Sequence, residues 1–254
     1  MAEPSKKRKG TSSRSQRHSG SQEAPIPPSI PSGSLFSSEE QRTRYTNLFS
    51  SCSIVDPKFI DMEFFSNENF ECFQAFENSN LIPFMSLKLP VYSELVKAFY
   101  SNLEIHEGAL IDEWKFDFSV HDARRLVCTN QADMTGRLLA GSLAFESRIL
   151  HYLIVRILLP RSSNLAQVSE EDLTVMWAFH KGLQIDWAHL VRYRMHKALR
   201  LNAPLPYPHL VTLFLQHFNI PLDFEPYVPI KRSFLIGASV IASFGYIKEH
   251  DGSW

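Results

Sequence analysis

Cysteine is scarce in this sequence. The chain of 254 residues has three cysteines, Cys52, Cys72 and Cys128, which are far apart and odd in number. Small secreted domains that depend on disulfides have paired cysteines at close spacing, so the sequence favours a reducing compartment with buried or inert thiols. No apolar signal-peptide core follows the charges near the N-terminus, and we therefore do not expect secretion.

The common catalytic and metal-binding motifs are also missing. The sequence has ten histidines, but no Cys-x-x-Cys, no His-Glu-x-x-His, no glycine-rich phosphate loop and no Gly-x-Ser-x-Gly. His189 and His196 are seven residues apart, with no third ligand near them in sequence. We therefore predict no catalytic residues, no metal site and no cofactor. His151 is interpreted as a histidine of the core rather than as a base.

Long hydrophobic runs are absent as well. The most apolar stretch lies in residues 146–160, where only His151 and Arg156 are strongly polar between Ile149 and Leu159. A bilayer requires about 20 apolar residues, so we expect no membrane segment. A surface helix keeps its apolar residues on one side, and a segment that is apolar all round therefore predicts the central helix of a domain. Pro160 predicts its end.

The charges that are present are unevenly distributed. Residues 1–20 have six basic side chains and one acidic one, whereas the rest of the chain has 20 basic and 26 acidic residues. Residues 1–34 are rich in Ser, Pro, Lys and Arg, which predicts a disordered tail. Within it lies a basic cluster of the nuclear-import kind, formed by Lys6, Lys7, Arg8 and Lys9. We expect the protein in the nucleus, and otherwise in the cytoplasm.

The rest of the chain predicts a mainly α fold, α+β with one small β-hairpin, in which a multi-helix globular domain follows the tail. Residues 35–90 are expected to form a helical segment that packs on a main domain at 91–254. Apolar residues recur with a helical period except in residues 103–118, where Trp114 and Phe116 alternate with charged neighbours. That alternation predicts the hairpin.

Capping signals predict where several helices begin. Ser38, Ser119, Ser169 and Asp186 each precede a segment of helical period, and short acidic or amide side chains follow the serines three residues later. The predicted helices are 38–49, 67–78, 91–103, 120–128, 146–160, 169–181, 187–201, 207–218 and 234–247.

Four cations on one predicted helix are nucleic-acid candidates in the folded part: Arg192, Arg194, Lys197 and Arg200. Interleaved with Tyr193, they could follow a phosphate backbone. The alternative is a solvated helix end whose cations complement the helix dipole, and the acidic balance of the domain favours it. In the tail, Arg14 and Arg17 join the basic cluster as candidates for non-specific contacts with nucleic acid.

Several segments together resemble one known family. They are residues 95–105 (LVKAFYSNLEI), 149–163 (ILHYLIVRILLPRSS), 170–191 (EEDLTVMWAFHKGLQIDWAHLV) and 204–222 (PLPYPHLVTLFLQHFNIPL), with 37–49 (SSEEQRTRYTNLF) upstream. This order is similar to the plant transposon protein domain family, which occurs in open reading frames of transposable-element origin. The resemblance implies ancestry and carries no reaction or catalytic residues. No acidic triad of the kind that holds two metals for strand transfer is found.

Three functions follow as hypotheses. The first is a non-enzymatic nuclear protein of transposable-element origin that acts through protein contacts and through non-specific nucleic-acid contacts of its tail. The second is a capsid-like protein that assembles by self-association. The third is a degenerate or partial transposase. A bound divalent ion with carboxylates converging on it would favour this hypothesis.

Overall fold

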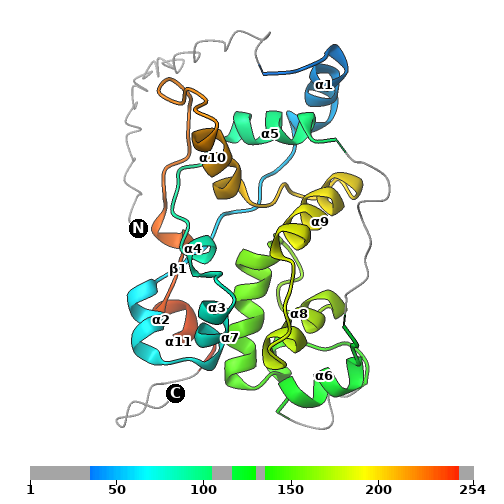
Figure 1. Ribbon diagram of the computed structural model, residues 1–254, viewed down its shortest axis with the longest axis vertical. Helices are drawn as coiled ribbons and strands as arrows, with labels where there is room; N and C mark the ends of the chain where they lie inside the picture. The colour runs from blue at the N-terminus through cyan, green and yellow to red at the C-terminus, as the bar shows by residue number, and fades with distance from the viewer. Residues whose placement is uncertain (1–34, 105–115, 130–134, 246–254) are drawn as a thin grey trace, which may run out of the picture. The chain divides into compact units, whose positions relative to one another are not determined.

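The structure is a computed structural model that describes residues 35–104, 116–129 and 135–245, all within one compact unit that spans residues 31–254. The described residues are mainly helical (Figure 1). Before residue 130 the helices are α1 (Glu39–Arg44), η1 (Tyr45–Phe49), α2 (Met62–Glu68), α3 (Glu71–Asn78), α4 (Ile82–Met85), α5 (Ser93–Asn102) and α6 (Val120–Val127). Those that follow are η3 (Ala140–Ser142), α7 (Phe145–Leu153), η4 (Ile154–Leu158), α8 (Glu170–His180), α9 (Trp187–Arg200), α10 (Pro208–His217), η5 (Arg232–Phe234) and α11 (Ala238–Ala242). The mainly helical fold class is confirmed.

The predicted helix starts are confirmed at all four capping residues. Ser38 accepts a hydrogen bond from the backbone of Gln41, and the Gln41 side chain accepts one from the Ser38 backbone. Ser169 forms the same reciprocal pair with Asp172. Ser119 and Asp186 cap α6 and α9 through single side-chain bonds. These bonds satisfy amide groups that have no partner inside the helix, so the local sequence was sufficient to predict them.

Two predicted helices are wrong in detail. The single helix expected at 67–78 is interrupted by Asn69, whose φ of 53° is left-handed and ends α2 before α3 begins. The last helix, expected at 234–247, is reduced to the short α11, because residues Leu235–Ile236 form strand β2 instead. The predicted hairpin at 103–118 falls mainly on residues 105–115, which lie outside the described residues.

Strand β2 pairs in parallel with β1 (Phe59–Ile60), with Ile60 opposite Ile236. The backbone of Asp61 continues the pairing by donating to the Ile236 carbonyl at 2.8 Å. Gly237 follows at a close approach, since a Cβ there would lie 3.1 Å from the Cβ of Asp61. The sheet therefore joins two segments that are far apart in sequence, and glycine leaves room for the cap of α2 beside it.

The predicted central helix is confirmed. Helix α7 and its π-helical continuation η4 place Ile149, Ile154 and Val155 at 0% exposure. Helices α3 and α8 lie against α7 (Figure 1). A smaller second core gathers Val96 and Tyr100 of α5 with residues of α9 and α10. Among the helices that the structure describes, none combines the length and apolar character needed to cross a membrane.

The central helix also explains why one cysteine is inert. Phe70, at the start of α3, has no side chain that can cap a helix, and Glu146 of α7 accepts hydrogen bonds from the backbones of Glu71 and Cys72 instead. Burial and the nearby Glu146 raise the pKa of the Cys72 thiol well above its ordinary value. A buried thiol with a raised pKa is expected to be unreactive.

Candidate functional site

The most polar buried cluster is built on Asp172, in the first turn of α8. Asp172 is 0% exposed, and Arg161 donates to both of its carboxylate oxygens at 2.8 Å. The same guanidinium donates to the Gln167 carbonyl at 2.7 Å. His151 of α7 is 1% exposed, and its Nε2 lies 3.6 Å from the carboxylate. The cluster thereby ties the loop 160–169 to α7 and to α8.

The charge of Asp172 is stabilised by these neighbours. Burial alone would raise the pKa of Asp172, but the contacts with His151 and Arg161 outweigh it and lower the pKa to about 2. A carboxylate with so low a pKa is a poor proton acceptor near neutral pH. Because Asp172 and His151 are also closed off from solvent, we interpret the cluster as structural rather than catalytic.

The preceding residue, Glu171, belongs to a second and more open cluster. Lys197 of α9 donates to both oxygens of Glu171 at 3.1 and 3.2 Å. Arg194, one turn earlier, lies 3.8 Å from the same carboxylate and donates to the Pro160 carbonyl at 3.1 Å. Burial would lower the pKa of Lys197, but the charge of Glu171 and a hydrogen bond with Tyr193 raise it, so the amine stays charged.

The four predicted cations of α9 therefore divide into two pairs. Arg194 and Lys197 are half-buried beside Glu171, whereas Arg192 and Arg200 are exposed. The candidates of the tail (Lys6, Lys7, Arg8, Lys9, Arg14 and Arg17) lie outside the described residues. Cations of one helix thus differ in burial and in their partners, and the spacing of these cations in the sequence does not predict the difference.

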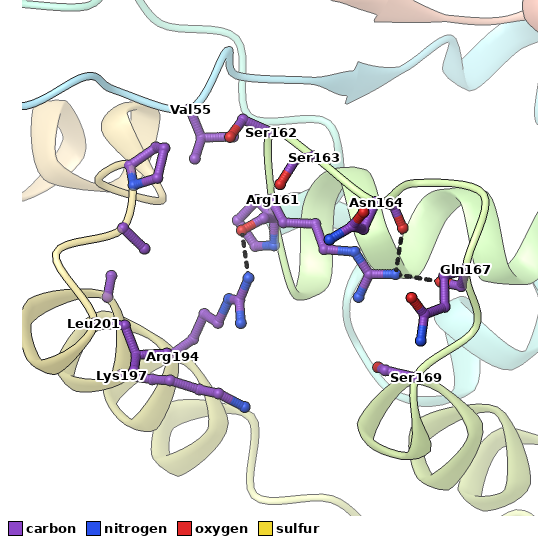
Figure 2. Close-up of a pocket in the computed structure, with 14 residues that line it drawn as sticks. Val55, Arg161, Ser162, Ser163, Asn164, Gln167, Ser169, Arg194, Lys197 and Leu201 are labelled. Carbon is purple, nitrogen blue, oxygen red and sulfur yellow. Dashed lines mark hydrogen bonds between the residues drawn. The ribbon is translucent and has the colours of Figure 1, made fainter. Parts of the chain in front are cut away.

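A pocket of about 290 Å³ opens between α9 and the loop 160–169 (Figure 2). Its charged lining residues are Arg161, Arg194 and Lys197, and no carboxylate lines it. The neutral polar lining residues are Ser162, Ser163, Asn164, Gln167 and Ser169. Figure 2 shows Arg194 and Lys197 extending from α9 toward the loop that holds Arg161. The arrangement is suited to an anion, because cations and hydrogen-bond donors converge on one cavity.

Arg161 and the loop that it belongs to were not predicted from the sequence. The available signal was the run Arg161-Ser162-Ser163-Asn164, an abrupt polar stretch directly after the most apolar helix. The π-helical turn of η4 ends this helix with a bond from the Leu159 amide to the Ile154 carbonyl, and the Arg161 amide then donates to Val155. Single π-helical turns are frequent at functional sites.

A different surface feature begins in the second half of α10 and continues beyond it. Six large apolar side chains between residues 213 and 230 are 38% or more exposed, with Phe224 at 89%, Phe218 at 71% and Tyr227 at 59%. The segment is anchored, because Val228 exchanges both backbone hydrogen bonds with Val91, at 2.8 and 3.0 Å. The ring of Tyr227 lies 5.8 Å from that of Tyr92. We call residues 213–230 the apolar segment.

Comparisons with protein-family models, with curated protein sequences and with solved structures returned no match. No activity is therefore carried to this chain from a related protein. Within the described ranges, no group of three or more His, Cys, Asp or Glu side chains could hold a metal ion. A function for this chain is therefore proposed from its own contacts, charges and exposed surfaces.

Proposed function

We propose that the protein is a non-enzymatic binding protein of transposable-element origin that acts in the nucleus through macromolecular contacts. In this proposal the folded unit makes protein contacts through the apolar segment, and the tail makes non-specific contacts with nucleic acid. The observation that carries the proposal is the exposure of the apolar segment. Six large exposed apolar side chains within 18 residues exceed the singly scattered ones that are normal on a surface, and such a concentration is expected at an interaction site.

The apolar segment has the properties of a docking surface. Pro221, Pro226 and Pro229 restrict its backbone, so less conformational freedom is lost when it binds. The bridge between Val91 and Val228 fixes its far end on the start of α5. Aromatic side chains such as Phe224 and Tyr227 supply large contact areas, and aromatic residues are enriched at the centres of protein interfaces.

The polar clusters support a binding role rather than a catalytic one. Asp172 and His151 are closed to solvent, and Glu171 is shared by Lys197 and Arg194. A degenerate transposase would need carboxylates that converge on metal ions, and the described residues contain no such group. In the alternative proposal of a capsid-like assembly, the same apolar segment would contact a second copy of the chain.

The protein-contact part of the proposal is tested with the full chain and two variants. We expect self-association in sedimentation velocity, or capture of a nuclear protein, that is lost in Phe224→Ser/Tyr227→Ser. The matched control is Leu48→Ser, which removes an apolar side chain that is 50% exposed outside the apolar segment. Contacts that respond equally to both variants, or no contacts in either assay, would contradict the proposal.

The nucleic-acid part is tested by a salt titration of binding. Six cations in residues 6–17 would release counterions with a slope of log K against log salt of about −4 to −5. Deleting residues 1–33 is expected to abolish most of the binding, because the rest of the chain has five more acidic than basic residues. If the truncated protein binds with the same affinity and slope, the tail is not the binding element.

A further inference from the structure

We infer that the pocket between α9 and the loop 160–169 binds a phosphate group, with Arg194 and Lys197 as the direct contacts. This inference is independent of the proposed function, since it concerns neither the apolar segment nor the tail. It rests on the charges that surround the pocket, on which of their donors are already used, and on the size of the cavity.

The charges around the pocket do not cancel. Three cations, Arg161, Arg194 and Lys197, line it, and the two carboxylates that pair with them, Asp172 and Glu171, do not. The pocket therefore has one positive charge in excess. The three cations are only partly exposed to water, with side-chain exposures of 16% for Arg161, 17% for Arg194 and 29% for Lys197. Charges in such a recess are screened less than those on an open surface, which favours an anion.

The three cations contribute in different ways. Both terminal nitrogens of Arg161 donate to Asp172, one of them also donates to the Gln167 carbonyl, and its Nε is buried, so this residue contributes mainly charge. Arg194 uses one terminal nitrogen for the Pro160 carbonyl, while its other terminal nitrogen lies 3.8 Å from Glu171, beyond hydrogen-bond distance. Lys197 has three donors, of which one can serve both oxygens of Glu171 and a second the side chain of Tyr193. Arg194 and Lys197 therefore retain donors for a ligand.

Neutral donors complete the pocket. Ser162 and Ser163 are exposed at its rim, on the loop that faces α9 (Figure 2). Hydroxyl and ammonium donors around a common cavity match the acceptor oxygens of a phosphate group. The volume of about 290 Å³ lies at the small end of ligand pockets, which suits one phosphate group better than a drug-sized molecule.

The phosphate group could belong to a small phosphorylated molecule or to the backbone of a nucleic acid. Both present the same oxygen acceptors to Lys197 and Arg194, so the pocket chemistry is shared. The two sources differ in reach, because a nucleic acid would also contact cations outside the pocket. Arg192 and Arg200 are exposed on the same helix and are available for such contacts. This difference allows one set of variants to separate the sources.

The test is calorimetric titration of the full chain with inorganic phosphate at constant ionic strength. Lys197→Gln cancels the excess charge and removes a contact, and we expect binding to weaken about tenfold. Glu171→Gln raises the excess to two charges, and we expect binding to strengthen. Arg200→Gln, the matched control on the same helix, should leave phosphate binding unchanged. Because the two main variants act in opposite directions, a loss of folding cannot imitate the result.

The second arm of the test uses a short single-stranded oligonucleotide in place of phosphate and the chain that lacks residues 1–33, because the tail is proposed to bind nucleic acid by itself. If oligonucleotide binding responds to Lys197→Gln and Glu171→Gln in the same directions, is also weakened by Arg200→Gln and is competed by phosphate, the ligand is the nucleic-acid backbone. If it ignores Lys197 while phosphate binding depends on it, the ligand is a small phosphorylated molecule. No saturable phosphate binding, or binding that is equal in Lys197→Gln, Glu171→Gln and the parent chain, would overturn the inference.

Discussion

Glu171 and Asp172 are neighbours in the first turn of α8, yet they occupy different environments. Asp172 is 0% exposed and is held by two hydrogen bonds from one guanidinium, whereas Glu171 has a 17% exposed side chain shared by Lys197 and Arg194. Successive residues of a helix point about 100° apart, so one acid faces the core and the other faces α9. Two adjacent acidic residues of one helix turn therefore have different roles: Asp172 forms a buried ion pair, and Glu171 holds the cations at the edge of the pocket.

The largest loss of stability is expected from a mutation at an apolar core position. Ile154 is 0% exposed at the junction of α7 and η4. In Ile154→Asp an unpaired charge would be buried, at a cost of several kcal/mol against a total stability of about 5–15 kcal/mol. We expect the protein to be unfolded by circular dichroism. A soluble variant with an unchanged melting curve would show that the central helix does not support the fold.

Removing the buried carboxylate should have the next largest effect. Asp172→Ala leaves the half-buried Arg161 charge without its partner and removes a cap of α8, for which we expect a loss of about 3 kcal/mol. Denaturant unfolding measures this loss. The matched control is Glu171→Ala, one residue earlier, for which we expect a change of about 1 kcal/mol or less. Equal losses in the two variants would mean that burial does not distinguish the two acids.

Acid should separate the two carboxylates without mutation. Because the pKa of Asp172 is lowered to about 2 in the folded state, its ionised form stabilises the fold at neutral pH. This contribution, about 2 kcal/mol, is complete above the unfolded-state pKa of about 4 and is lost as the pH falls toward 2.

The measurement is the free energy of unfolding between pH 5 and pH 2. Glu171→Gln keeps Asp172 and should retain the fall. Asp172→Asn lacks the titrating group, so its curve should be flatter. A parent chain and an Asp172→Asn variant with curves of the same slope would show that Asp172 is not the source of the acid sensitivity.

Signals that act over a few residues were enough to predict much of this fold. The caps at Ser38 and Ser169 and the central helix around Ile154 depend on neighbours in sequence, and all three were predicted correctly. Strand β2 was not predicted, because it forms only when Ile236 meets Ile60 across the chain. The transposable-element ancestry, the nuclear location and the role of the tail remain predictions.

The candidate site was predicted less well than the fold, for the same reason. Arg194 and Lys197 were singled out, but as members of one basic helix face together with Arg192 and Arg200. The pairing of Lys197 with Glu171 joins residues 26 positions apart, and that of Arg161 with Asp172 joins residues 11 positions apart. Such pairs depend on how the loop 160–169 and α9 pack, which no local pattern specifies.

The most direct test of the contrast between the two acids is a pair of double-mutant cycles on the free energy of unfolding. One cycle combines Asp172→Asn with Arg161→Gln, and the other combines Glu171→Gln with Lys197→Gln. Both pairs join α8 to a neighbouring element, but only the first has a fully buried carboxylate. We predict a coupling energy of about 3 kcal/mol for the buried pair and about 1 kcal/mol or less for the open one. Equal coupling energies, or a larger value for Glu171 and Lys197, would contradict the distinction between a structural cluster and an open binding pocket.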